Sequence, residues 1–357
     1  MHIPDGYLSP STCAALYVGS APFWYVALQR LKRRLATRLI PLLSVFSAFS
    51  FVVMMFNLPL PGGTTGHAVG VSIAAIVLGP WASILAVSIA LFIQAIFFGD
   101  GGITALGANC FNMAIVGSLV AYLSYRAVSG RSAIASHRRV VAAGIAGYLA
   151  INAAALLAAV EFGIQPLLFH DASGTPLYAP YPLQIAIPAM MAGHLTIAGM
   201  AELVLTAGLV AWLQRTRPSL LSATAPGASE TAPESAGLGW RAVRPLWIGL
   251  TALMLATPLG ILAVGTAWGE WSPHDLADAN ARQEIAAASA NQAPPAAVPQ
   301  GLERLAAVWT APFPDYAPPF LRSPSFGYLL SAAFGSGLIL LAAVVANWAF
   351  AARRRSG

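Results

Sequence analysis

The chain has 357 residues, of which 57% are hydrophobic and only 9% are charged. A soluble domain carries about a quarter charged residues, so this composition excludes an ordinary soluble enzyme and predicts a protein that crosses a membrane several times. The net charge of +6 comes mainly from short basic clusters between apolar segments, so it indicates membrane topology rather than nucleic-acid binding.

The amino terminus brings several nitrogen atoms close together. No lysine or arginine precedes Arg30, so the start lacks the basic region of a secretory signal, and we expect the native terminus to be kept. A bulky His2 should block removal of Met1, which leaves the α-amine, the His2 amide and the His2 imidazole within reach of one ion. A nearly planar nitrogen set points to Ni²⁺ or Cu²⁺ rather than to Zn²⁺ or Mg²⁺. These two residues alone are also typical of an ordinary polar start.

Long apolar segments follow along the rest of the chain. A span of a ~30 Å hydrocarbon core takes about twenty residues. Segments of this kind lie near residues 11–29, 40–57, 80–98, 103–125, 139–160, 184–213, 242–267 and 326–350. A shorter apolar stretch at 68–79 ends at Gly79, and Pro80 is typical of the first position of the next helix.

The basic clusters fix the expected topology. They comprise Lys32, Arg33, Arg34 and Arg38, then Arg126, Arg131, Arg138 and Arg139, then Arg215, Arg217, Arg241 and Arg244, and finally Arg353, Arg354 and Arg355. If all are cytoplasmic, the chain crosses an even number of times between the first two clusters, so 68–79 must also cross, as a short or broken helix buried by its neighbours. We therefore expect an all-α integral membrane protein with nine spans, its amino terminus outside and its carboxyl terminus cytoplasmic.

Composition divides the chain into three parts. Residues 214–241 contain a polar stretch rich in alanine, proline and serine, which is typical of a flexible linker, here on the cytoplasmic side. Residues 1–213 then form a seven-span membrane domain. Residues 242–357 form an accessory two-span hairpin with a large outside loop at about 268–325.

The expected topology places Met1, His2, His67 and Asp100 at the same face of the membrane. His67 follows Thr65 in a glycine-rich loop that enters the short span, and glycines allow the backbone to approach a bound ion closely. A solvated histidine in a tight turn is the alternative interpretation. Asp100 lies among glycines and is also typical of a turn.

Polar side chains within the predicted spans need partners. Gln94, Asn109 and Asn112 carry amides that are costly to bury alone, so we expect them to be hydrogen-bonded, most simply as structural contacts between spans. His194 and Glu202 lie in one predicted span. Ionisable residues there are functional candidates, although a buried His–Glu pair that fixes two helices is the favoured interpretation.

Several motifs are absent from the sequence. It has no Gly-x4-Gly-Lys-Ser/Thr loop, no His-Glu-x-x-His and no Gly-x-Ser-x-Gly. The chain is therefore not expected to hydrolyse ATP or to be an enzyme, and uphill transport would need a partner or an ion gradient. Cys13 and Cys110 sit in apolar surroundings, where two buried thiols are more typical than a disulfide.

Three blocks in the first 110 residues resemble the substrate-capture component of nickel and cobalt energy-coupling factor transporters. They are Met1-His2-Ile3-Pro4-Asp5-Gly6-Tyr7-Leu8-Ser9-Pro10, Gly63-Thr64-Thr65-Gly66-His67, and Gly101-Gly102-Ile103-Thr104-Ala105-Leu106-Gly107-Ala108-Asn109. The similarity extends to about residue 213. The stretches 257–263 and Trp268-Gly269-Glu270-Trp271, with Pro314-Asp315, resemble the small accessory subunit of the same systems, fused here at the carboxyl end.

The resemblance implies a metal held in a square plane by the Met1 α-amine, the His2 backbone and side-chain nitrogens, and the His67 imidazole. Supporting candidates are Thr65, Asp100, Asn109, Asn112, His194 and Glu202. Cobalt-type members often have a histidine where this chain has Asp100, which favours Ni²⁺ and leaves Co²⁺ open.

The expected function is that of a subunit that captures and translocates a divalent transition metal, not of an enzyme. It would carry no cofactor besides the transported ion. By resemblance it would work in the cell membrane with a transmembrane coupling subunit and two cytoplasmic ATPases. The alternative is a self-sufficient secondary permease that uses His194 and Glu202 as a proton relay. A membrane enzyme is a third possibility, disfavoured by the absent motifs.

Overall fold

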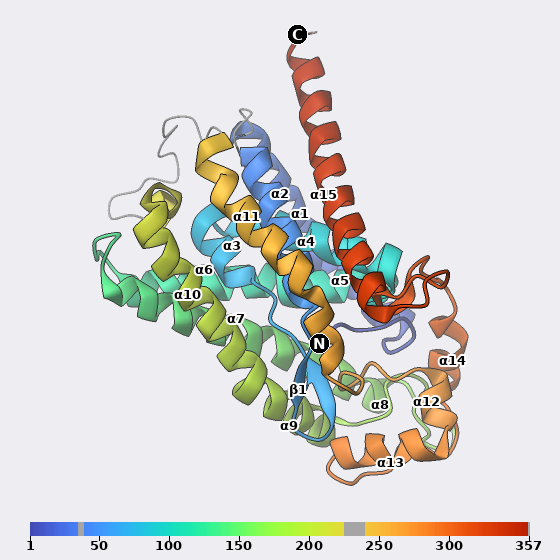
Figure 1. Ribbon diagram of the computed structural model, residues 1–357. Coiled ribbons are helices and arrows are strands. Elements are labelled where there is room, and N and C mark those ends of the chain that lie inside the picture. Colours follow the sequence, from blue (N-terminus) through green and yellow to red (C-terminus); the bar gives the residue numbers. More distant parts are fainter. Residues whose placement is uncertain (35–38, 225–239, 356–357) are drawn as a thin grey trace.

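The fold is described from a computed structural model, which describes residues 1–34, 39–224 and 240–355. Arg38 of the first basic cluster and residues 225–239 of the expected linker lie outside the described residues. The described chain is mostly helical (Figure 1). Within these ranges, six helical segments are long and apolar enough to cross a membrane. The protein is therefore a multi-pass helical protein, as the composition predicted, and the nine-span count is not confirmed by these segments alone.

The first helices lie where spans were predicted, although of these only the segment Pro80–Phe98 belongs to the six candidate spans of the described residues. Helix α1 covers Pro10–Arg34, α2 covers Leu39–Met54 and α4 covers Pro80–Ile93. Between α2 and α4, the short apolar stretch forms α3, Val71–Leu78, all eight residues of which are buried. Eight helical residues rise only about 12 Å, so α3 is the short, protein-covered helix expected from the sequence, and it does not cross a bilayer alone.

Three of the long helical segments contain a π-helical turn. These turns are η1 at Gln94–Phe98 after α4, η2 at Cys110–Val116 between α5 (Leu106–Asn109) and α6 (Gly117–Ser129), and η3 at His194–Ala198 between α9 (Leu183–Gly193) and α10 (Gly199–Thr216). Such turns occur frequently at functional sites. Gln94, Asn112 and His194, all singled out from the sequence, lie in them.

The long helix α7, His137–Gly163, packs between α6 and α10 and is followed by α8, Gln165–Leu168. Its amino-terminal end meets the end of α10 and the 3-10 helix η4, Pro218–Thr224: Gln214 Nε2 donates to the Ile134 carbonyl at 2.7 Å, and Arg139 Nη2 donates to the Thr224 carbonyl at 2.8 Å. The start of α7, with Arg138 and Arg139, and the end of α10, with Arg215, therefore lie next to each other.

The glycine-rich loop forms a small β-hairpin that the all-α expectation omitted. Strand β1, Leu58–Leu60, pairs antiparallel with β2, Thr64–Gly66, with Leu58 opposite Gly66. Gly62 and Gly63 adopt φ angles of 83° and 75°, which permit the tight reversal. Thr65 also forms a parallel bridge with Ala267, so the hairpin joins the two halves of the chain.

The carboxyl-terminal helices pack on the core. Helix α11, Trp240–Ala256, continues into the 3-10 helix η5, Thr257–Leu262, and both α11 and the long α15, Pro324–Arg355, contact α2. The contacts are close: a Cβ at Gly260 would lie 2.1 Å from the Met55 carbonyl oxygen, and one at Gly335 would lie 2.2 Å from the Phe51 ring. Between α11 and α15 lie α12, Pro273–Ala277, α13, Ala279–Ala288, α14, Gln300–Ala306, and the 3-10 turn η6, Pro314–Tyr316.

The start of the chain and the end of α15 lie at opposite ends of the helical bundle (Figure 1). Figure 1 shows the amino terminus near the β-hairpin and η5, at the end of the bundle that also carries α12, α13 and α14. The carboxyl-terminal end of α15 lies on the opposite side of the bundle (Figure 1). Cys13 and Cys110 are free, buried thiols, as expected.

Candidate metal centre

The first residues of the chain are inserted into the protein. Met1, His2 and Ile3 are all buried. The Asn109 side chain binds both backbone groups of Ile3: its Oδ1 accepts from the Ile3 N–H at 2.8 Å, and its Nδ2 donates to the Ile3 carbonyl at 3.1 Å. The Gly102 N–H also donates to the Ile3 carbonyl at 2.8 Å. A Cβ at Gly102 would lie 2.3 Å from the Asp5 nitrogen, so this segment fits only against glycine.

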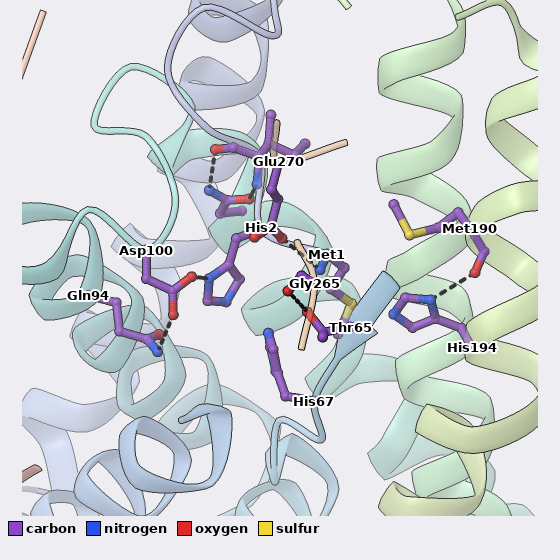
Figure 2. Close-up of polar contacts among 12 residues, drawn as sticks. Met1, His2, Thr65, His67, Gln94, Asp100, Met190, His194, Gly265 and Glu270 are labelled. Carbon is purple, nitrogen blue, oxygen red and sulfur yellow. Dashed lines mark hydrogen bonds and ion pairs between the residues drawn. The ribbon is translucent and has the colours of Figure 1, made fainter. Parts of the chain in front are cut away.

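The two histidines predicted as ligands face each other. The rings of His2 and His67 lie edge to face with centroids 4.9 Å apart, and the two residues are 1% and 6% exposed. Figure 2 shows Met1 beside the two histidines. Burial, then the nearby His2 and the amino terminus, lower the pKa of His67 well below its ordinary value. The neutral imidazole, which is the form that binds metals, is therefore favoured.

Each of the other two predicted ligands contacts a carboxylate. The Met1 ammonium donates to Glu270 Oε1 at 3.1 Å. His2 Nδ1 forms a short contact with Asp100 Oδ1, and Asp100 Oδ2 accepts from Gln94 Nε2 at 3.2 Å and from the Tyr316 hydroxyl. Burial alone would raise the pKa of Asp100, but its electrostatic interaction and hydrogen bond with His2, together with His67 and the Tyr316 hydroxyl, lower it below its ordinary range. Asp100 is therefore anionic.

This arrangement bears on how an ion would be bound. A chelate ring that includes the His2 backbone nitrogen closes through Nδ1, and Nδ1 is the atom that contacts Asp100. His2 Nε2 has no hydrogen-bond partner among the described residues. To bind a metal in a square plane of the predicted kind, His2 Nδ1 must therefore give up its contact with Asp100, and the Met1 amine must give up its hydrogen bond to Glu270.

Proteins commonly hold metals with clusters of side chains. Across residues 1–34, 39–224 and 240–355, no group of three or more His, Cys, Asp or Glu side chains could hold a metal ion. The predicted ligand set does not depend on such a cluster, since it takes the α-amine and a backbone nitrogen of the chain start together with two imidazoles. Those nitrogen atoms match the donor preference of Ni²⁺.

The supporting candidates take different positions. Thr65 Oγ1 donates to the Gly265 carbonyl at 3.3 Å and thus binds the carboxyl-terminal region (Figure 2). Asn109 holds Ile3, as described above. Asn112 Nδ2 donates to Glu161 Oε2 at 2.7 Å, away from the histidines. Gln94, Asn109 and Asn112 are therefore hydrogen-bonded, as expected from their burial.

The predicted His194–Glu202 pair is not formed. His194 Nδ1 donates to the Met190 carbonyl at 2.8 Å (Figure 2). Glu202 Oε2 instead accepts from the N–H groups of Val69 and Gly70 at 2.8 and 3.0 Å. Two backbone donors satisfy this carboxylate oxygen by charge-assisted hydrogen bonds, and they come from a loop that is distant in sequence.

Two site residues were not predicted from the sequence. Glu270 and Tyr316 belong to the loop between α11 and α15, and they contact Met1 and Asp100. Glu270 lies in the Trp268–Trp271 block that carried the resemblance, and Trp271 accepts from the Tyr7 hydroxyl at 2.7 Å through its carbonyl. The site is therefore not confined to the first 110 residues, although all the predicted metal ligands are.

The buried nitrogen set and the helical bundle define a multi-pass membrane protein with a candidate metal centre at its amino terminus. The family described as the cobalt uptake substrate-specific transmembrane region matches residues 2–220, and the PDGLE domain matches residues 244–352. The chain therefore belongs to the cobalt uptake substrate-specific transmembrane family, of the CbiM/NikM type with a NikN-like fusion.

Individual relatives agree with this assignment. The chain is 56% identical, over the full length of both proteins, to the fused nickel transport protein NikMN of Rhodobacter capsulatus. It is 43% identical, over 93% of each chain, to the probable fused nickel transport protein LarMN of Lactiplantibacillus plantarum. A crystal structure of a truncated transition metal transporter is 50% identical and superposes with a TM-score of 0.57, covering 60% of this chain and 99% of that one. The chain is thus a member of a nickel and cobalt transport family.

Proposed function

We propose that this chain captures Ni²⁺ as the substrate-specific membrane subunit of an ATP-driven, energy-coupling factor importer. The observation that carries the proposal is the burial of the Met1 amine, His2 and His67 against one another. Burying a terminal amine and two imidazoles costs more than burying apolar residues of similar size. Packing alone therefore does not explain why these groups lie together. It provides nitrogen donors for a divalent ion, which is the cargo; no other cofactor is proposed.

Ni²⁺ is proposed over Co²⁺ for two reasons. The donor set of amine, amide and imidazole nitrogens favours a planar arrangement, which Ni²⁺ adopts. Asp100 occupies the place where cobalt-type members often carry a histidine, and here it binds His2 rather than adding a nitrogen donor. The names of the relatives of Rhodobacter capsulatus and Lactiplantibacillus plantarum, both nickel transport proteins, agree.

Energy would come from partner proteins. The sequence lacks a phosphate-binding loop, so the proposed complex adds a transmembrane coupling subunit and two cytoplasmic ATPases. The secondary-permease alternative needs His194 and Glu202 to pass protons to each other. Each of these side chains is instead hydrogen-bonded to backbone, which favours the ATP-driven importer.

We further propose a nine-span topology with the amino terminus outside and the carboxyl terminus cytoplasmic in the cell membrane. The arginines at the start of α7 lie beside the basic end of α10, as expected if both segments face the cytoplasm. The proposed parts are a metal-capture domain at 1–213, a cytoplasmic linker at 214–241 and an accessory hairpin at 242–357. In this arrangement the accessory loop covers the outside mouth of the metal site.

The test uses purified protein whose amino terminus is unmodified. Isothermal titration measures the affinities for Ni²⁺, Co²⁺, Cu²⁺ and Zn²⁺. Of the two candidate transported ions, Ni²⁺ should bind more tightly than Co²⁺. One residue inserted between Met1 and His2 displaces the amine from the chelate, so tight binding should disappear while the protein stays folded. Equal Ni²⁺ affinity for the two proteins would refute the proposed site. Proton-gradient-driven uptake by this chain alone in liposomes would favour the permease.

A further inference from the structure

Glu202 connects the last helix of the membrane domain to the loop that carries His67. Glu202 lies in the first turn of α10 and is 0% exposed. Its Oε2 accepts two hydrogen bonds, from the backbone N–H groups of Val69 at 2.8 Å and Gly70 at 3.0 Å. Both donors belong to the four-residue segment between β2 and α3, which begins with His67. A single side chain therefore binds the loop two and three residues after the predicted ligand.

The loop has an electrostatic reason to bind a carboxylate. The first N–H groups of a helix have no partner within the helix, and they give its start a partial positive charge. Gly70 caps α3 with a φ of 70° and offers no side chain to the free amides. Val69 and its neighbours are buried, so water cannot replace the missing acceptor. Glu202 accepts from the N–H groups of Val69 and Gly70 just before α3, and so places its negative charge beside the helix start from a different helix.

His67 is thus fixed from both sides. On one side, Gly66 pairs with Leu58 in the β-hairpin. On the other, Gly70 lies against Phe49, whose ring would come within 2.6 Å of a Cβ at that position. Only Ala68 and Val69 separate His67 from this second anchor, so the backbone has little freedom to turn the imidazole away from His2.

The position of Glu202 is itself fixed by α7. A Cβ at Gly147 would lie 2.8 Å from the Glu202 carbonyl oxygen and 2.9 Å from Thr206 Oγ1, so the two helices touch at this level. Any movement of α10 relative to the β-hairpin therefore pulls on the backbone beside His67.

We propose that Glu202 is a positioning residue that holds the His67 loop, residues 67–70, in the conformation that binds the transported ion. This inference rests on the proposed function, since His67 is a ligand only there. Glu202 does not touch the metal in this proposal. It acts through the two backbone N–H groups, and its loss lets His67 leave the site while the Met1 and His2 nitrogens stay in place.

The experiment compares four full-length proteins with native amino termini: Glu202→Leu, Glu202→Gln, and the controls Thr206→Val and Glu161→Gln. Thr206 is buried one turn further along the same helix, and its Oγ1 has no hydrogen-bond partner in the described part of the chain. Glu161 is a second buried glutamate, and its Oε2 binds Asn112 rather than the loop. Calorimetry measures Ni²⁺ affinity, and hydrogen exchange of the metal-free proteins follows residues 64–70.

Glu202→Leu should weaken Ni²⁺ binding by at least about tenfold, since it removes two charged hydrogen bonds. Glu202→Gln should lose less, because its amide oxygen still accepts. Both controls should bind like the wild type. Exchange at residues 64–70 should accelerate in Glu202→Leu and remain unchanged in Thr206→Val.

A double-mutant cycle separates positioning from general damage. In a His67→Ala background, Glu202→Leu should cause no further loss of the residual binding by the amino-terminal nitrogens. The proposal is overturned if Glu202→Leu weakens Ni²⁺ binding as much in the His67→Ala background as in the wild type. It is also overturned if a folded Glu202→Leu protein has wild-type affinity and exchange, or if Thr206→Val weakens Ni²⁺ binding equally. A wild-type protein that binds no Ni²⁺ would refute the proposed function instead, and the exchange data on metal-free protein would still decide whether Glu202 holds the loop.

Discussion

Asn109 is the side chain that most directly fixes the buried amino terminus. Both of its polar atoms bind the Ile3 backbone, at 2.8 and 3.1 Å. Asn109→Ala removes both bonds at once and leaves the residues around the histidines unchanged. We expect this substitution to weaken Ni²⁺ binding because the segment that carries Met1 and His2 no longer docks fully.

The size of the effect follows from the two lost partners. The Ile3 carbonyl keeps its bond from Gly102 at 2.8 Å, so its loss is small. The buried Ile3 N–H has no other acceptor among the contacts of the described residues, and an unsatisfied buried donor costs about 1–3 kcal/mol. If that energy is lost from docking, the apparent Kd rises by about fivefold to about 150-fold.

Calorimetry on protein with a native amino terminus measures the change, and the same span supplies a control. Asn112 is also a buried amide, three residues further on, but it donates to Glu161 and not to the amino terminus. Asn112→Ala should therefore bind Ni²⁺ within about twofold of wild type. A folded Asn109→Ala protein with wild-type affinity would refute the reasoning, and equal losses in the two variants would indicate damage to the helix rather than to docking.

Three further outcomes are expected. Ni²⁺ affinity should fall on acidification only at a pH well below 6.5, because the lowered pKa of His67 delays the protonation that competes with the metal. Calorimetry should also show that His67→Ala loses most binding whereas His137→Ala, at the start of α7, does not. The metal-free protein should lose thermal stability as the pH falls below about 6.5, because the pKa of His67 is lowered in the folded state and the unfolded chain takes up the proton first; a His67→Gln protein with the same slope would contradict this. Truncation near residue 220 removes Glu270 and Tyr316 but no predicted ligand, so calorimetry should give Ni²⁺ affinity within about tenfold, while vesicle uptake by the full complex should fall strongly.

A large part of the candidate site could be predicted from the sequence. Charge placement put Met1, His2, His67 and Asp100 at one face of the membrane. In the structure His2 contacts His67 and Asp100, and the amino terminus lies close enough to His67 to lower its pKa. This worked because helix ends are dictated by long apolar runs and basic clusters, which are local signals. The short helix α3 was likewise predictable, since its run of apolar residues is bounded by Gly70 and Gly79.

The remaining contacts depend on tertiary packing between distant segments. Glu270 is 269 residues from Met1, and Tyr316 is 216 residues from Asp100. No periodicity or motif links such pairs, although the block around Glu270 carried the resemblance. The partner of Glu202 was misjudged for a similar reason: a carboxylate that binds backbone N–H groups leaves no trace in the identity of Val69 or Gly70.

The ion pair between the Met1 amine and Glu270 has a consequence for how the protein matures. In cells that begin translation with formylmethionine, the nascent chain carries a neutral formamide at this nitrogen, which can neither act as an ammonium donor to Glu270 nor bind a metal as a free amine. Removal of the formyl group thus becomes a step in assembling the site. A residue added before Met1 would convert this amine into a peptide amide, so under the proposed function the position of the start codon affects a proposed metal ligand.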